Sequence, residues 1–461
     1  MINDFSLGGI GKARGLPSEA ADVADELANV LASNAQRNRL RRMYFDGKVG
    51  PKPLGISMPK NVDLGVACSW PEKAVMSLAN RSNFDGYVGS DAELLSGIVS
   101  RTRLVDKYSK AVVSELTHGP VFATVSKDRR TGLAQANYHS AETASALWDN
   151  VAQRISAGLA VIDGKRSNSD GAYRPSVVNV YLDDATWVLV HDGRDWTADR
   201  REHAMGRPMM EPMIYRADVS KPFGRSRISR PVMSLTDDYL REMERVEVSA
   251  EFYTNPQRWV AGLSDDQLKA LVEDKWNLVI GSIMAFTENP QTGVAPTVGQ
   301  FAQMSMEPHI KYIEALANQF SGVTSIPVSD LGVVQSTYIS AEAVQTAAAN
   351  LCIEAEALNR SNGEALDNVA AMLYAVDSNG SFDDAKALDF EAHFKDPRKP
   401  SLVAQADAIL KAIQAVPKLS QSDYSLEQLG ISQADIVRIN SDAERAAGIA
   451  NLVDFELEEE V

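Results

Sequence analysis

Histidine, cysteine and acidic side chains are the residues of this sequence that would hold a metal ion or transfer protons. The six histidines are scattered, and no HExxH pair occurs among them. The two cysteines, Cys68 and Cys352, lie far apart and form no CxxC motif, whereas zinc sites usually draw Cys and His ligands from short spacings. The sequence therefore predicts no metal centre. It predicts two buried thiols in a reducing compartment rather than a disulfide framework.

Motifs that bind nucleotides or activate a nucleophile are also missing. There is no GxxxxGK[ST] phosphate loop, and Gly9-Ile10-Gly11 lacks the third glycine of a dinucleotide fingerprint. No GxSxG elbow occurs. The neighbouring carboxylates Asp183-Asp184 and Asp237-Asp238 are more typical of a solvated turn or a helix start than of a Mg²⁺ or Ca²⁺ site. The sequence thus predicts no cofactor and no catalytic residue.

Three groups of basic residues interrupt the chain. The first ends an N-terminal helix, where cations complement the helix dipole, the second falls in a polar loop region, and the third precedes a long charged helix. The groups are Arg37, Arg39, Arg41 and Arg42; Arg194, Arg200, Arg201 and Arg207; and Lys221, Arg225, Arg227 and Arg230. Each group is suited to contact phosphates or a neighbouring subunit, and we favour the subunit contact.

The overall composition limits the classes of protein to which the chain can belong. Its 461 residues include 62 acidic and 46 basic side chains, which gives a formal net charge of −16. Hydrophobic residues make up 44%, so a packed core and two to four domains are expected. The acidity disfavours a protein that coats duplex DNA, because that binding depends on phosphate neutralisation by Lys and Arg. No apolar run is long enough to span a bilayer, and the N-terminus lacks a secretion signal.

Hydrophobic periodicity predicts helices in the first part of the chain and strands after them. An amphipathic helix is expected over residues 18–42, a second over 71–80 and a third over 91–117. From 120 to 232, β-rich stretches alternate with the turn signals Asp163-Gly164, Asp170-Gly171 and Asp192-Gly193. The first 230 residues are therefore predicted to form one α+β domain.

The second half of the chain is predicted to be mostly helical. A charged helix is expected over 234–254, with Ser234 as its cap, followed by a compact insertion and a shorter helix over 308–320. Residues 321–339 show too little periodicity for helix or strand. Ser340 caps the longest helical pattern, 341–376, in which Gly363 predicts a kink. A linker, short helices and an acidic tail complete the sequence.

This order of elements resembles the portal proteins of long-tailed bacteriophages, in the siphophage branch. The resemblance covers residues 31–412, and the order of several short phrases carries it. These phrases are Tyr44-Phe45-Asp46-Gly47-Lys48, Pro53-Leu54-Gly55-Ile56, Pro222-Phe223-Gly224-Arg225-Ser226-Arg227-Ile228, Glu251-Phe252-Tyr253, Pro256-Gln257-Arg258-Trp259-Val260 and Ile339-Ser340-Ala341-Glu342-Ala343.

The resemblance implies an α+β, portal-type fold that is assembled as a ring of twelve subunits around a DNA channel. Residues 1–232 would form most of the wing, 233–256 and 308–320 the two stem helices, and 257–307 the clip between them. The tunnel loop would be 321–339, and the long wing helix with the completion of the wing would be 340–400. A small helical crown-like region and an acidic tail would occupy 401–461.

Candidate site residues follow from this assignment, since the tunnel loop carries Asp330 as its one charge and would grip phosphates weakly. The candidates that face DNA are Lys311, Gln319, Thr324, Ser325, Gln335 and Ser336. Lys311 is equally suited to a salt bridge with Glu307 or Glu314. Glu288, Asn289 and Gln291 are candidates for partner docking at the clip. Arg225, Arg227, Arg230, Arg241 and Glu244 are candidates for subunit contacts.

The resemblance further implies partners, a location and a role. The ring would stand at one vertex of the capsid in the virion, after assembly in the host cytoplasm. It would contact the terminase large subunit, the head-tail adaptor, capsid and scaffolding proteins, and double-stranded DNA in transit, with no membrane. Two alternatives stay open: another capsid-associated adaptor or scaffold protein, and an enzyme that uses carboxylates such as Asp183 or Asp237.

Overall fold

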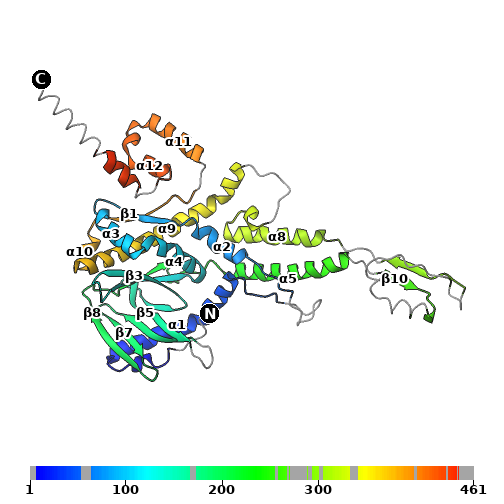
Figure 1. The fold of residues 1–461 in the computed structure, drawn as a ribbon, viewed down its shortest axis with the longest axis horizontal. Helices are drawn as coiled ribbons and strands as arrows, with labels where there is room; N and C mark the ends of the chain where they lie inside the picture. The colour runs from blue at the N-terminus through cyan, green and yellow to red at the C-terminus, as the bar shows by residue number, and fades with distance from the viewer. Residues whose placement is uncertain are drawn as a thin grey trace.

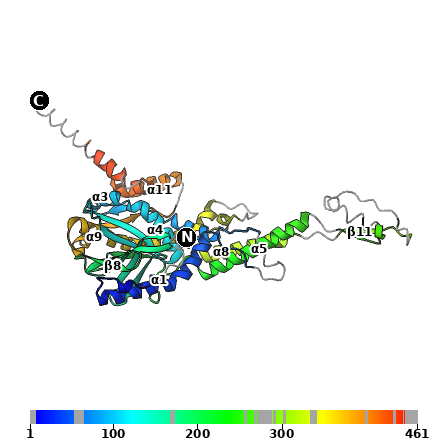
Figure 2. The same cartoon turned by 60° about the horizontal axis from the view of Figure 1, so that its bottom comes forward.

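The computed structural model describes residues 7–52, 64–166, 173–254, 258–266, 269, 288, 293–300, 305–332, 341–398, 402–431, 435–443 and 445. Helices and strands gather in one body, from which a pair of helices projects to one side (Figure 1). A second view, turned about the long axis, shows the same projection (Figure 2). The fold mixes helix and sheet, as the sequence predicted.

The N-terminal part of the chain lies against a five-stranded antiparallel sheet. A short 3-10 helix, η1 (Ile10–Lys12), leads into α1 (Ser18–Phe45). The sheet has the order β4 (Ala144–Asp149), β5 (Arg154–Arg166), β6 (Tyr173–Tyr181), β7 (Ala185–His191) and β8 (Trp196–Glu202). Apolar side chains of η1 and α1 pack on this sheet and form a separate small core with Leu159, Val180 and Leu189.

A larger core lies between a three-stranded antiparallel sheet and several helices. The sheet has the order β3 (Ala134–Ser140), β2 (Pro120–Lys127) and β9 (Met210–Ile214). The long helix α9 (Ala341–Ser378) packs on all three strands, and α4 (Leu104–His118) packs on β2 and β3. Because α9 supplies buried Leu366, Val369 and Met372 to the same cluster as the N-terminal elements, the core is built from two distant parts of the sequence.

Two further strands join those distant parts directly. β1 (Phe84–Val88) pairs antiparallel with β12 (Glu391–Phe394), and Phe84 and Phe394 contact each other edge to face. Of three short helices nearby, α3 (Ala92–Thr102) packs on β1, while α2 (Trp70–Ala79) packs on α4 and α9, and α10 (Phe382–Lys386) packs on α9. Near the C-terminus, α11 (Leu402–Ala415), η3 (Pro417–Gln421) and α12 (Asp423–Gln428) contact one another and lie above the α3 side of the body (Figure 1).

The projecting pair consists of α5 (Arg230–Thr254) and α8 (Glu307–Thr324), which lie side by side in both views (Figures 1 and 2). Beyond their far end lies a two-stranded hairpin, β10 (Arg258–Ala261) with β11 (Thr297–Gln300). Trp259 lies over Gly299, where a Cβ atom would stand 2.4 Å from the indole ring. This pairing was not predicted, because its strands are only four residues long.

Several predicted element boundaries are corrected by the structure. The expected helix over 91–117 is two helices, because Arg103 adopts a left-handed conformation with a φ of 54° between α3 and α4. α5 begins at Arg230 rather than after Ser234, and α8 continues to Thr324, into the segment expected to be irregular. A further 3-10 turn, η2 (Val328–Leu331), follows there.

Two glycine signals were also misinterpreted. α9 is assigned as one continuous helix through Gly363, where we predicted a kink. Asp163-Gly164 lies inside β5 at an irregular register, not in a turn, and the Tyr173 ring covers Gly164 from β6. Asp192-Gly193 does form the predicted turn between β7 and β8, whereas Asp170-Gly171 lies outside the described residues.

Gly224 is expected to be intolerant of any side chain. Its φ is +64°, and an added Cβ would stand 2.2 Å from the Tyr215 carbonyl oxygen. Gly224→Ala should therefore lower the free energy of unfolding by about 1–3 kcal/mol. The matched control is Gly97→Ala within α3, where the added Cβ meets nothing within 4 Å and should stabilise by about 0.5–1 kcal/mol. Chemical denaturation of both variants measures the two changes, and equal effects would contradict the proposed role of Gly224.

Candidate functional site

A largely buried hydrogen bond holds the two projecting helices together. His309 of α8 places Nδ1 2.6 Å from Oε1 of Glu242 on α5, and the other oxygen of Glu242 lies 3.1 Å from Arg245. The second ring nitrogen of His309 lies 3.2 Å from the Ser249 hydroxyl. The Glu242 side chain is only 5% exposed, so this contact fixes how α8 is turned against α5. Sequence reasoning missed it, because neither residue belongs to a recognisable motif.

At the base of the pair, one tryptophan connects four elements. Trp70, the first residue of α2, packs against Tyr239 of α5 at 4.4 Å between ring centroids and against Phe320 of α8 at 5.2 Å. Its indole N–H donates to the Leu331 carbonyl in η2 at 3.3 Å. Residues that follow α8 are thereby attached to the body at the same point as both helices.

Arg227 forms a second connection at this base. Its Nη2 donates to the Thr324 carbonyl at the end of α8 at 2.7 Å, and its Nε donates to the Ala74 carbonyl in α2. Nη1 lies 2.6 Å from the Glu354 carboxylate of α9. The Arg227 side chain is 4% exposed. We had expected Arg227 to contact a neighbouring subunit; instead it lies inside the chain and joins three helices.

α1 is attached to α5 through a carboxylate that we had considered as a metal or acid-base candidate. Asp237 accepts hydrogen bonds from the Tyr44 hydroxyl at 2.7 Å and from Lys52 Nζ at 2.6 Å. Its neighbour Asp238 pairs with Arg241 one helical turn away. Since the two carboxylates point to different partners, they do not form a joint site.

The other acidic pair and the two cysteines also have structural rather than chemical roles. Asp184 pairs with Arg200 at 2.6 Å in the exposed turn between β6 and β7. Both cysteines are buried, as predicted, and burial raises the pKa of the Cys68 thiol to about 12.

Within the described residues, no group of three or more His, Cys, Asp or Glu side chains is arranged to hold a metal ion. No helix among these residues is both long and apolar enough to cross a membrane.

The candidates for DNA contact differ in whether the structure exposes or buries them. Lys311 is exposed, and its Nζ lies 2.6 Å from the Glu307 carboxylate. This is one of the two salt bridges that we predicted as the alternative to DNA contact. Gln319 is exposed on α8, whereas Thr324 is buried and donates its hydroxyl to the Phe320 carbonyl. Ser325 ends α8 in a left-handed conformation. Thr324 is therefore removed from the candidates, and Gln335 and Ser336 lie outside the described residues.

The remaining candidates are mostly exposed. Glu288 of the insertion is exposed, while Asn289 and Gln291 lie outside the described residues. Arg225 pairs with Asp218 on the surface, and Arg230 is exposed at the start of α5. Glu244 is buried within the chain, so it is corrected in the same way as Arg227.

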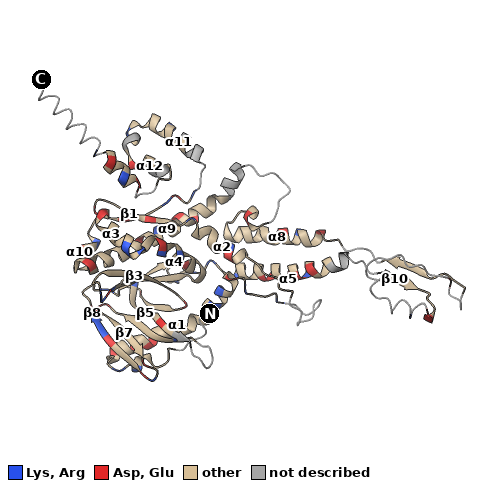
Figure 3. Cartoon of the chain, in the orientation of Figure 1, with Lys and Arg blue, Asp and Glu red and all other residues tan. Residues whose placement is uncertain are grey.

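The second basic group is only partly in loops. Arg194 lies in the turn between β7 and β8, as expected, whereas Arg200 and Arg201 lie in β8. Arg207 lies in the connection between β8 and β9 and is buried against Glu211. The charged residues of the chain are otherwise spread over the body and along both projecting helices (Figure 3).

Comparison with known proteins identifies relatives along most of the chain. The portal protein of Mycobacterium phage D29 is 22% identical over 415 residues, covering 85% of this chain and 83% of the relative. That of Mycobacterium phage L5 is 22% identical over 414 residues, with coverages of 85% and 82%.

Among solved structures, the neck of an empty gene transfer agent particle, computed with C6 symmetry, matches with a TM-score of 0.48 and 13% identity, covering 78% of this chain and 90% of that one. The neck of a native particle, computed with C12 symmetry, matches with a TM-score of 0.43 and 12% identity over 78% and 89%. Residues 72–430 match the family described as phage portal protein, SPP1 Gp6-like, and the chain belongs to this family.

Proposed function

We propose that this portal protein assembles into a ring, of twelve subunits as the family resemblance implies, at one vertex of a phage capsid. Double-stranded DNA would pass through the ring during packaging and ejection. In this assignment α5 and α8 are the stem, residues 255–306 the clip and 325–339 the tunnel loop. Residues 1–229 and 340–400 form the wing, and 401–461 a small crown.

The observation that carries the ring is the distribution of apolar side chains on α8. The helix buries Leu316, Ala317 and Phe320 within the subunit. At about 100° per residue, Tyr312 and Val323 lie on one flank of that buried face, and Ile310 lies on the other. These three are 44%, 44% and 55% exposed. A stem that has a neighbour on each side would cover both flanks and bury these three side chains, which is favourable for apolar surface.

The same geometry indicates which side of α8 faces the channel. Lys311, Ala315, Asn318 and Gly322 lie opposite the face that packs on α5, and all four are exposed. This face carries one cation, which pairs with Glu307 of its own helix. A lining of this composition would retain phosphates weakly, which suits a channel through which DNA must slide. Gln319 lies on the same flank as Tyr312, so it belongs closer to the subunit contact.

We assign no active site to the ring and expect the packaging terminase to move the DNA. The clip, whose described strands β10 and β11 lie beyond the far end of the stem helices (Figure 1), would dock the terminase large subunit and later the head-tail adaptor. Glu288, with Asn289 and Gln291, stays the candidate surface for this contact. The ring would be a component of the virion that is assembled in the host cytoplasm.

Electron microscopy of the purified protein tests the assembly. We expect particles with a central channel and a resolved rotational symmetry, in which α8 lies nearer the axis than α5. Particles that stay monomeric or dimeric at every salt concentration would contradict the proposal. A closed assembly without an axial opening as wide as duplex DNA would instead favour a different capsid-associated protein.

A substitution at Asn318 tests the channel-facing side. Asn318→Arg would add one cation per subunit to that face, and each phosphate contact that must be broken raises the barrier to sliding. Packaging of DNA into procapsids should slow several-fold at low salt and recover at higher salt. Asn318→Asp is the matched control at the same position, and it should leave the rate unchanged. Equal rates for both variants and the wild type would place another face of α8 on the channel.

A further inference from the structure

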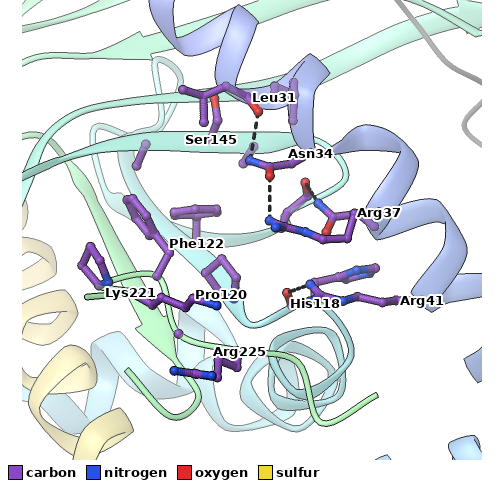
Figure 4. A pocket seen from close by; sticks show the side chains of 18 residues that line it. Leu31, Asn34, Arg37, Arg41, His118, Pro120, Phe122, Ser145, Lys221 and Arg225 are labelled. Carbon is purple, nitrogen blue, oxygen red and sulfur yellow. Dashed lines mark hydrogen bonds between the residues drawn. The ribbon is translucent and has the colours of Figure 1, made fainter. Parts of the chain in front are cut away.

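A cavity of about 310 Å³ lies between α1, the start of β2, β4 and the segment 221–225. Its lining combines residues of the first and third basic groups of the sequence, which lie far apart along the chain. Figure 4 shows Arg37 and Arg41 reaching it from α1, with Lys221 and Arg225 on the opposite side. The walls are largely apolar and include Leu31, Phe122 and Pro222. Folding thus brings two separate cationic segments to one pocket.

The charge of this cavity is not balanced by its own walls. Four of its lining residues are Arg or Lys, and none of the lining residues is Asp or Glu. Arg225 pairs outside the cavity with Asp218. Arg41 uses Nη1 for the His118 carbonyl at 2.7 Å, and Arg37 uses Nη2 for the Asn34 side chain at 2.6 Å. The contacts of Arg41 and Arg37 are to neutral oxygens, so they do not compensate the positive charges of these two side chains.

Buried donors in the lining also lack partners among the described residues. Arg41 Nε is buried without a hydrogen-bond partner. Both ring nitrogens of His118, whose side chain is only 1% exposed, also lack one, and at least one of them carries an N–H donor. The Glu142 carboxylate lies 3.6 Å from His118 Nε2, which is too long for a hydrogen bond. Burial and repulsion from Arg37 lower the pKa of Arg41 to about 10. Unsatisfied buried donors are costly, so each of these features favours an anion in the cavity.

We propose that this cavity binds an oxyanion, and that in the assembled ring the oxyanion is a carboxylate from a second copy of the chain. The second part rests on the proposed ring. Guanidinium groups bind carboxylates and phosphates with the same donors. The apolar walls would contact the methylene groups of an inserted Asp or Glu side chain, and a free phosphate offers no such groups. A chain with 62 acidic residues supplies many candidates for insertion.

Charge reversal at one lining residue tests the proposal against a matched control. Arg37→Glu and Arg39→Glu make the same change on the same helix, but only Arg37 lines the cavity. We expect Arg37→Glu to weaken ring assembly at least 10-fold at low salt, as judged by the subunit concentration at which rings form. Arg39→Glu should assemble as the wild type does. Circular dichroism and melting of the unassembled variants verify that both subunits are folded.

Inorganic phosphate is the direct probe of the site. Millimolar phosphate, compared with chloride at equal ionic strength, should raise the melting temperature of the unassembled wild-type subunit. The same phosphate should leave unassembled Arg37→Glu unchanged. Wild-type rings should not respond, because a neighbouring carboxylate already fills the cavity.

Results that differ from these expectations would refute either the oxyanion site, the second copy as the source of the oxyanion, or the ring. Phosphate that stabilises rings as strongly as subunits would refute the second copy as the source, since the cavity would then be open in the ring. No response of the subunit, together with equal assembly of both variants, would refute the oxyanion site. A wild-type protein that never forms rings would refute the proposed function, while the phosphate measurement on subunits would still decide the site.

Discussion

Replacing Arg227 with alanine is expected to lower the free energy of unfolding by about 3–5 kcal/mol, because it leaves a buried carboxylate without its main partner. Glu354 is 11% exposed and lies 2.6 Å from Arg227. It also accepts the Tyr215 hydroxyl and lies 2.8 Å from the exposed Arg216. Those two contacts would remain, but the buried cation would be lost.

The backbone contacts of Arg227 enlarge the effect. The Thr324 and Ala74 carbonyls each accept from this guanidinium. The Ala74 carbonyl keeps the Ser77 hydroxyl as a donor, but the Thr324 carbonyl at the end of α8 would lose the donor that Arg227 supplies, and a buried acceptor left without a donor costs about 1–3 kcal/mol. Arg227→Lys should not rescue the variant, since one ammonium cannot reproduce the fork that reaches α2, α8 and α9 together. The base of the projecting helices should loosen before the rest of the body unfolds.

Arg225→Ala provides the matched control, two residues away in the same segment. Arg225 is 55% exposed and pairs with Asp218 on the surface, where an ion pair contributes little. Urea denaturation of the unassembled variants should therefore separate the two substitutions by several kcal/mol. Hydrogen exchange should show faster exchange in α8 of Arg227→Ala. Similar stabilities for both variants would refute the role of Arg227 as the connection between these helices.

The contrast between Arg225 and Arg227 illustrates what the sequence can predict. Composition and spacing identified a basic segment before the long charged helix, and the resemblance placed it correctly at the entrance to α5. In a regular strand Arg225 and Arg227, two residues apart, would lie on the same side. The backbone here is irregular, and the sequence does not say which of the two side chains becomes covered. Burial of Arg227 depends on α2, α8 and α9, which come from three distant parts of the chain.

The positions of helices were predicted well, because they depend on local sequence patterns. The roles of side chains that depend on contacts across the fold were missed. α2 and α9 begin within a residue or two of their expected positions, since periodicity and Ser or Pro at helix starts are local signals. The His309–Glu242 contact and the cavity between α1 and segment 221–225 depend on packing across the fold. Gly363 predicted a kink by its type, yet Asn362 beside it is held by a buried network that supports a continuous helix.

That network contains Glu115, whose substitution should change the pH dependence of stability. Glu115 on α4 is completely buried, and burial raises its pKa to about 8. Asn362 of α9 donates to Glu115 Oε2 at 2.8 Å and to the Tyr108 hydroxyl at 3.1 Å. Glu115 Oε1 and Asn362 Oδ1 have no partner among the described residues. A neutral carboxylic acid, with one O–H donor, suits this site better than a carboxylate does.

The sign of the effect follows from proton binding. Between pH 4.5, where an unfolded glutamate titrates, and about 8, the folded protein holds a proton that the unfolded chain has released. Stability from this group is therefore complete below pH 4.5 and falls as the pH rises through that interval. A shift of this size corresponds to about 5 kcal/mol at most, at about 1.4 kcal/mol per unit.

Glu115→Gln should remove this dependence, because an amide is neutral at every pH in the interval and keeps a donor and an acceptor. Wild type and variant should have similar stabilities at pH 5, and the variant should be more stable by several kcal/mol at pH 9. Glu93→Gln, at an exposed position of α3, is the control and should follow the wild type throughout. Denaturation of unassembled subunits across this range measures the difference. A difference between Glu115→Gln and wild type that is independent of pH would mean that Glu115 is already ionised in the folded core, with a cation or water that supports it.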